Sequence, residues 1–195
     1  MEKFDVAHEF TYGWEGDLSD DKHDHGGLTH WGVSFAFLSD FAKPTANAKF
    51  LRDLGVGPLP VTRTTIRNLS PAQARAIFRA EFWEPLRLDD MPTQMGVLLY
   101  DCAVNAGRRQ SVKLAQRGYN ACVTHGVPLS VDGILGPLTR AALEQNNTKP
   151  VRQAICTARE NFYKELVRKD ASQGDFLGGW LNRVEDLRRY VEGIK

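Results

Sequence analysis

Apolar residues recur at helical spacing along most of the chain, which limits the folds that the sequence can adopt. β-branched residues do not gather in the alternating runs that would predict strands. A strongly apolar segment at residues 93–106 predicts a buried helix. We therefore expect a mainly α fold, with one small β-hairpin or polar loop near the N-terminus.

Further helices are expected on both sides of this segment. Near the N-terminus, apolar residues recur at spacings of three, three and four, which predicts one face of a helix that ends near Glu15. These residues are Phe4, Ala7, Phe10 and Trp14. The other helices are expected at residues 35–41, 46–54, 71–83, 108–124, 137–146, 150–169 and 177–192.

The composition is typical of a soluble globular protein, with 42% hydrophobic and 25% charged residues among 195. The 25 basic side chains balance the 24 acidic ones, so we expect no nucleic-acid partner. No stretch approaches about 18 apolar residues, so we expect no stable membrane insertion. We also expect the protein to be a monomer. The three cysteines, Cys102, Cys122 and Cys156, form no CxxC pair, which is typical of free thiols in a reducing cytoplasm.

The residues with the clearest chemistry are Glu15, Asp24 and Thr29. Glycoside hydrolysis needs one protonated carboxyl for the leaving oxygen and a second group on the opposite face of the sugar. Glu15 follows Trp14 at the end of the expected helix, where burial beside aromatics would raise its pKa as a general acid requires. Asp24 lies in a polar, glycine-rich loop and should stay ionised, and Thr29 supplies a hydroxyl that can hold a water. Spacing alone favours another interpretation, because most Glu and Asp pairs at such a separation are solvated surface charges.

A longer motif surrounds these residues. Glu15-Gly16 is followed, at residues 24–34, by Asp-x-Gly-Gly-x-Thr-x-Trp-Gly-Val-Ser. This motif resembles that of glycoside hydrolase family 108, the phage and prophage N-acetylmuramidases used as endolysins. The resemblance continues at residues 81–83, 91–92 and 100–107, through a predicted peptidoglycan-binding region at residues 131–139, and into a C-terminal signature at residues 179–184.

The resemblance implies a lysozyme-like fold and hydrolysis of the β-1,4 bond between N-acetylmuramic acid and N-acetylglucosamine in bacterial peptidoglycan. Glu15 stands at the family's catalytic acid, and no cofactor is needed. The order Glu, Asp, Thr also resembles the triad of the tailed-phage lysozymes, which gives Asp24 and Thr29 roles in stabilising positive charge or orienting water. Trp31 is expected to line the glycan cleft, and His30 to hydrogen-bond the substrate.

The expected organisation is a catalytic lysozyme-like part at residues 1–92 and a helical part at residues 93–195, packed together as one compact unit. The second part carries the peptidoglycan-binding-like segment. The N-terminus lacks the basic stretch and apolar core of a signal peptide. Together with the resemblance, this predicts synthesis in the cytoplasm of a bacterial host and release to the cell wall through a holin.

Asp101 and Asn105 lie four residues apart on the apolar segment, so they share one face of the expected helix. Buried polar groups in such a helix need partners. Either Asn105 hydrogen-bonds a sugar acetamido group, or the pair caps a neighbouring loop.

Two other functions fit the same sequence. His23, His25 and His30 lie close together, so a zinc-dependent cell-wall amidase or peptidase is one alternative to a metal-free muramidase. A non-catalytic wall-binding protein is the other.

The C-terminal segment contains Trp180 together with Arg183, Arg188 and Arg189. Such a combination can form an amphipathic membrane-active helix. Acidic residues dilute the charge, so we favour a helix that packs against the rest of the chain.

Overall fold

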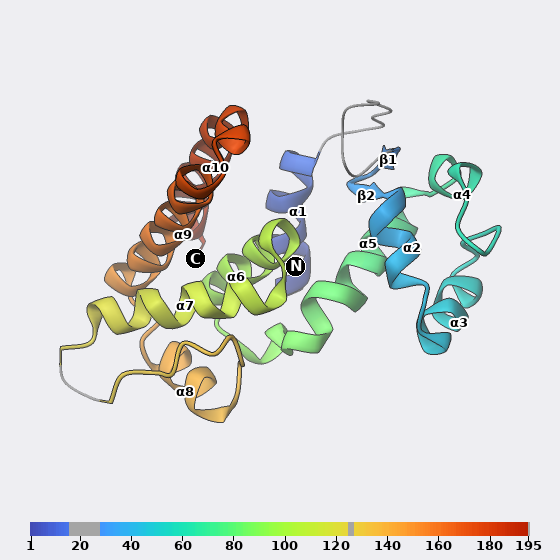
Figure 1. The fold of residues 1–195 in the computed structure, drawn as a ribbon. Helices are drawn as coiled ribbons and strands as arrows, with labels where there is room; N and C mark the ends of the chain where they lie inside the picture. The colour runs from blue at the N-terminus through green and yellow to red at the C-terminus, as the bar shows by residue number, and fades with distance from the viewer. Residues whose placement is uncertain (16–27, 125–126, 195) are drawn as a thin grey trace. The chain divides into compact units, whose positions relative to one another are not determined.

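The computed structural model describes residues 1–15, 28–124 and 127–194, apart from the side chain of Glu15. Within these residues the protein is mainly α-helical, with one two-stranded antiparallel sheet (Figure 1). The expected mainly α fold class with a small hairpin near the N-terminus is thus confirmed. The chain forms two compact units, residues 11–81 and residues 1–10 with 82–195, which we call the hairpin unit and the helical unit. The assignment of separate roles to residues 1–92 and 93–195 stays a prediction.

The hairpin unit holds the shorter elements of the chain. In chain order they are the C-terminal end of α1 (Lys3–Glu15), β1 (Thr29–His30), β2 (Val33–Ser34), α2 (Phe35–Phe41), α3 (Thr45–Asp53), α4 (Arg63–Arg67) and α5 (Pro71–Phe78). The buried residues of this unit include Thr11, Leu28, Val33, Leu38, Leu51, Ile66 and Ile77.

Side-chain caps start three helices of the hairpin unit, α2, α4 and α5. Thr62 and Thr65 form a capping box at the start of α4, and Ser70 and Gln73 form one at the start of α5. Each box gives hydrogen-bond partners to backbone N–H groups that the first helical turn leaves unpaired. Helix α4 was not expected from the sequence, because its five residues are too few to show helical periodicity.

The helical unit is built around α6 (Thr93–Ala106). Every residue from Met95 to Ala103 is buried, as expected for an apolar helix that is covered on all sides. Three later helices, α7 (Arg108–Cys122), α9 (Lys149–Lys169) and α10 (Gly174–Gly193), pack against it (Figure 1). The elements of this unit that follow the π-helical segment η1 (Arg79–Trp83) are η2 (Glu84–Leu86), η3 (Leu88–Asp90), α6, α7 (Arg108–Cys122), α8 (Pro137–Gln145), α9 (Lys149–Lys169), η4 (Ala171–Gln173) and α10 (Gly174–Gly193).

Two glycines allow α7 to pack closely against its neighbours. Gly107 joins α6 directly to α7 with φ 87° and ψ 148°, a conformation that is essentially restricted to glycine. Gly118 lies where α7 crosses α9, and a Cβ atom there would lie 2.5 Å from both the backbone N and the Cα of Ile155. The backbones of α7 and α9 are therefore in near contact.

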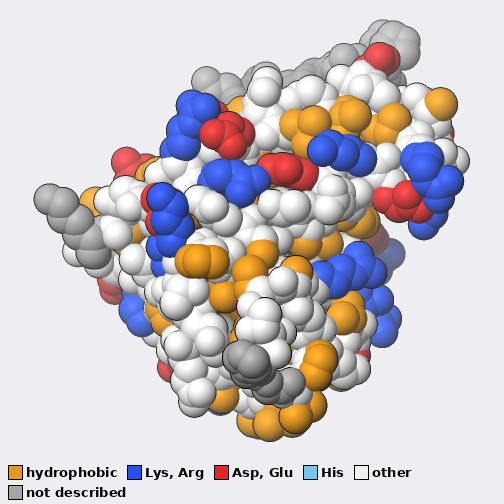
Figure 2. Space-filling model, turned by 90° about the vertical axis from the view of Figure 1, so that its left-hand side faces the viewer, with side chains coloured by type: hydrophobic (Ala, Val, Ile, Leu, Met, Phe, Trp, Pro, Cys, Tyr) orange, Lys and Arg blue, Asp and Glu red, His pale blue; other side chains and the backbone are white. Residues whose placement is uncertain are grey.

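The basic residues of α10 each pair with an acidic side chain, and Arg183 and Arg188 find theirs on other helices. Arg183 is buried, Arg188 forms an ion pair with Glu160, and Arg189 forms one with Glu185. Basic and acidic side chains are interleaved on the face drawn in Figure 2. The preference for a packing helix over a membrane-active one agrees with these contacts. None of the helices in the described part of the chain is long and apolar enough to cross a membrane.

We expect Gly118→Ala to lower the free energy of unfolding by about 1–3 kcal/mol, because the new methyl group would force α7 and α9 apart. The matched control is Gly178→Ala in α10, where an added Cβ meets nothing within 4 Å. This change should leave stability unchanged or raise it by about 0.5–1 kcal/mol, because alanine favours a helix interior. Urea unfolding measures both. If both variants changed the free energy of unfolding equally, the close packing of α7 on α9 would be contradicted.

Candidate active site

The hairpin holds three of the predicted site residues, Thr29, His30 and Trp31. Thr29 is paired with Ser34, and the turn between the strands consists of Trp31 and Gly32. Both turn residues have positive φ, 54° for Trp31 and 76° for Gly32, as in the turns usual for two-residue hairpins. This conformation is strained for tryptophan and persists only where surrounding contacts impose it.

Contacts from three other residues hold Trp31 in this conformation. Its Nε1 donates a hydrogen bond to the backbone oxygen of Leu69 at 2.9 Å. Its ring stacks with His30, at 4.8 Å between ring centroids, and with Tyr12, at 6.2 Å. The hairpin turn is therefore fixed to α1 and to Leu69, two residues before the start of α5.

Tyr12 places the hairpin beside the last turn of α1, because Tyr12 lies three residues before Glu15, where the helix ends. The predicted end of this helix at Glu15 is confirmed. The prediction that Trp14 lies on the buried face is wrong: its side chain is 36% exposed, and Thr11 is buried instead. Tertiary packing, rather than apolar spacing, selects the buried face here.

The side chain of Glu15 and the whole of Asp24 lie outside the described residues, so their placement and pKa values stay predictions. Thr29 is half-buried in β1. The structure thus brings Thr29, His30 and Trp31 together next to the end of α1.

His30 has a defined hydrogen bond. Its Nδ1 lies 3.1 Å from the backbone oxygen of Ile66, and a carbonyl only accepts, so Nδ1 is the donor. In the neutral imidazole, Nε2 is then an acceptor. His23 and His25, which the zinc alternative requires, lie outside the described residues. Among residues 1–14, 28–124 and 127–194, no group of three or more His, Cys, Asp or Glu residues could hold a metal ion.

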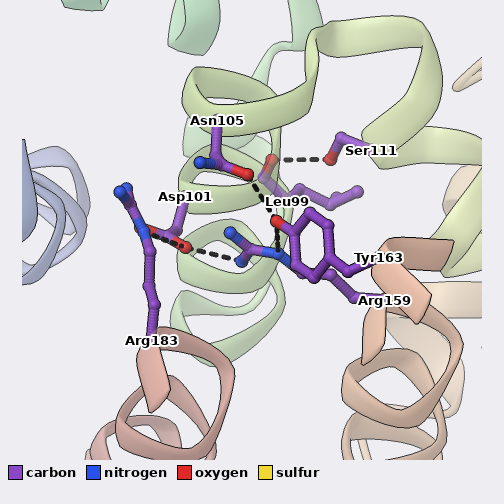
Figure 3. A network of polar contacts seen from close by, with 7 residues as sticks. All are labelled: Leu99, Asp101, Asn105, Ser111, Arg159, Tyr163 and Arg183. Carbon is purple, nitrogen blue, oxygen red and sulfur yellow. Dashed lines mark hydrogen bonds and ion pairs between the residues drawn. The ribbon is translucent and has the colours of Figure 1, made fainter. Parts of the chain in front are cut away.

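Asp101 is the centre of a polar network that joins α6, α9 and α10 (Figure 3). Its Oδ2 accepts a hydrogen bond from Arg159 Nη1 at 2.6 Å, and its Oδ1 accepts one from Arg183 Nη2 at 2.7 Å. All three side chains are buried, with exposed fractions of 0%, 2% and 6% for Asp101, Arg159 and Arg183.

The charges of this network stabilise one another. Burial alone would raise the pKa of Asp101, but the two guanidinium groups lower it below its ordinary value. Burial alone would likewise lower the pKa of Arg159, and the Asp101 carboxylate raises it instead. The carboxylate therefore stays ionised inside the protein.

The network extends to Asn105 through Tyr163. Arg159 Nε donates to the Tyr163 hydroxyl at 2.7 Å, and this hydroxyl donates to Asn105 Oδ1. Burial raises the pKa of Tyr163 to about 12, so its hydroxyl stays protonated. The partners of the Asp101 and Asn105 side chains in this network therefore come from helices, not from the neighbouring loop that one sequence interpretation proposed. The contact of Asn105 with a sugar stays a prediction.

One feature of the sequence indicated such a network, since a buried aspartate in an apolar helix needs a partner. It did not identify Arg159, Arg183 or Tyr163 as the partners. These residues lie 58 to 82 positions away from the groups that they bind.

The turn in the peptidoglycan-binding-like segment is fixed to α7 by Gln116. The buried Gln116 side chain donates through Nε2 to Asp132 Oδ1 at 2.9 Å and to Thr139 Oγ1 at 3.1 Å. Its Oε1 accepts from the backbone N of Gly133 at 3.0 Å. This segment is therefore an integral part of the helical unit.

Comparison with known proteins now identifies the family. The sequence matches glycosyl hydrolase 108 over residues 8–107 and the predicted peptidoglycan domain over residues 110–185. The first match covers just over half of the residues, so the chain belongs to glycosyl hydrolase family 108. No match was found among curated protein sequences.

The fold is similar to that of SagA from Brucella abortus, with a TM-score of 0.74 and 23% sequence identity over 97% of this chain and 93% of that chain. At this identity the similarity concerns the fold, and the expected lysozyme-like fold class is confirmed. Family membership and the second matched domain make the protein a glycoside hydrolase that acts on peptidoglycan.

We expect Asp101→Asn to lower the free energy of unfolding by about 3–5 kcal/mol, because it leaves two buried guanidinium groups without their counter-ion. The folded-state pKa of Asp101 lies below the ordinary 3.8, so the stabilisation is present above that pH and is lost as the pH falls through the lowered value. The melting temperature of the wild type should therefore fall more steeply below about pH 4 than that of the variant. The exposed Asp175→Asn is the control. If the melting temperatures of the wild type and Asp101→Asn fell equally steeply below about pH 4, the role of this carboxylate would be contradicted.

Proposed function

We propose that the protein is an N-acetylmuramidase that cleaves the β-1,4 bond between N-acetylmuramic acid and N-acetylglucosamine and lyses bacterial cells as a phage-type endolysin. The observation that carries the proposal is the stack of Tyr12 on Trp31, beside the helix end at Glu15. The stack holds the hairpin that carries Thr29 against the last turn of α1, which supports a role for Thr29 in the same reaction as Glu15. Family membership supplies the reaction class, and this arrangement supports the assignment of the groups.

In the proposed reaction, Glu15 donates its proton to the leaving glycosidic oxygen. Asp24 stabilises the developing positive charge from the opposite face of the sugar or orients the attacking water. The Thr29 hydroxyl helps to hold that water. No metal or other cofactor takes part.

His30 and Trp31 have different roles beside these groups. With its Nδ1 donating to Ile66, a neutral His30 can accept a hydrogen bond from a sugar hydroxyl at Nε2. The Trp31 indole N–H already donates to Leu69, so Trp31 contributes its half-buried ring to the cleft lining and supports the strained turn.

We expect Glu15→Gln to reduce peptidoglycan hydrolysis by about 10²–10⁴-fold, because glutamine cannot donate the proton that the leaving oxygen needs. The matched control is Glu9→Gln, an exposed position on the same helix, which should keep wild-type activity. The release of reducing ends from purified cell walls measures the rate.

Full lytic activity in Glu15→Gln would overturn the assignment of the acid. New free amines in place of reducing ends, with sensitivity to EDTA, would instead identify a zinc-dependent amidase or peptidase. Binding to cell walls without cleavage would identify a non-catalytic wall-binding protein.

A further inference from the structure

Three aromatic side chains of α9 and α10 form a stack that runs from the interior to the surface. Tyr163 stacks with Trp180 at 5.0 Å between ring centroids, and Trp180 stacks with Phe176 at 5.8 Å. Tyr163 is buried, Trp180 is half-buried, and Phe176 is 55% exposed. Stacked rings that remain exposed in this way are typical of binding surfaces rather than of a core.

A hydrogen-bond donor lies at the other end of Tyr163. The Tyr163 hydroxyl donates to Asn105 Oδ1, which fixes the amide plane so that Nδ2 points away from Tyr163 (Figure 3). Asn105 is exposed, and its Nδ2 donates a hydrogen bond to no residue in the described part of the chain. Because Arg159 and Asp101 hold Tyr163 in turn, the donor is positioned by a chain of buried groups.

The surface beside the exposed rings is bare. Gly179 lies three residues after Phe176 and one before Trp180, and a Cβ atom added to it would meet nothing within 4 Å. Glycine in a helix interior costs stability, and no contact within the described residues requires it here. The position leaves room for a ligand to approach the helix backbone.

This combination fits an N-acetylated sugar. One face of a pyranose ring consists mainly of C–H groups, which pack on an aromatic face, while an acetamido carbonyl at its edge accepts a hydrogen bond. Binding sites for small ligands commonly join an apolar surface to a few fixed polar groups. Trp180 and Phe176 supply the surface, and Asn105 supplies the fixed donor.

We propose that Asn105, Phe176 and Trp180 form a binding subsite for an N-acetylated sugar of the peptidoglycan strand. The proposal rests on the proposed function, because it takes the glycan as the substrate. Both aromatic residues lie in the matched peptidoglycan domain, and Asn105 lies in the matched hydrolase region. Asp101, Arg159 and Tyr163 are positioning residues that act through Asn105.

The test measures the affinity for the β-1,4-linked N-acetylglucosamine tetrasaccharide by calorimetry, with the Glu15→Gln protein as the reference so that the ligand is not hydrolysed. Adding Asn105→Asp keeps an acceptor for Tyr163 but replaces the donor by an oxygen. It should raise Kd about tenfold, as should Trp180→Ala. The matched control is Asn161→Asp, an exposed position on α9 with the same change in charge, which should leave Kd unchanged.

A second readout separates positioning from a loss of fold. The reference protein should prefer the N-acetylated tetrasaccharide over the glucosamine tetrasaccharide, and Tyr163→Phe, which frees the Asn105 amide to rotate, should reduce this preference. If Trp180→Ala does not fold, Phe176→Ala takes its place. Unchanged affinity and preference in Asn105→Asp and in the aromatic variant would overturn the subsite. That result is independent of whether Glu15→Gln is active, which tests the muramidase proposal alone.

Discussion

The helical unit depends most on the two ion pairs that the buried carboxylate of Asp101 forms with Arg159 and Arg183. It joins α6 to α9 through Arg159 and to α10 through Arg183. Asp101 lies in the matched hydrolase region, whereas Arg159 and Arg183 lie in the matched peptidoglycan domain. A buried charge without its partners is strongly destabilising, so the ion pairs select one arrangement of the three helices. The same arrangement brings Tyr163 to Asn105 and leaves Trp180 and Phe176 at the surface. The ion pairs that stabilise the helical unit and the proposed sugar-binding subsite are thus parts of one network.

The hairpin unit follows a different physical rule. It contains a two-residue turn in which tryptophan occupies a strained conformation, held by a hydrogen bond to Leu69 and by stacking on Tyr12. Such strain persists only where surrounding contacts impose it, and the same contacts hold the hairpin that carries Thr29 against the last turn of α1. The candidate groups for catalysis belong to this unit, while Asn105 belongs to the helical unit.

Much of the helical framework could be predicted from the sequence because local signals agreed with the final packing. Helices α2 and α6 have the predicted bounds, and the apolar segment at residues 93–106 is the buried centre of its unit. Helix α4 was missed because it is short. Trp14 was wrongly placed on a buried face because the contacts that bury one side of α1 come from residues far along the chain.

The site could be predicted only in part. Motif resemblance pointed to Glu15, Asp24 and Thr29, and the structure describes the surroundings of Thr29 alone among their side chains. The hydrogen bonds of His30 with Ile66 and of Trp31 with Leu69 span 36 and 38 residues, so no local pattern could reveal them. The partners of Asp101 were hidden for the same reason.

The most direct test of the proposed activity identifies the sugar at the new reducing end. Purified peptidoglycan is digested, reduced with borohydride, hydrolysed in acid and examined by mass spectrometry. A muramidase leaves N-acetylmuramic acid at the reducing end, so the wild type should give muramitol and Glu15→Gln should give almost none. Glucosaminitol as the main product would contradict the proposal, because the enzyme would then cleave the other glycosidic bond of the strand.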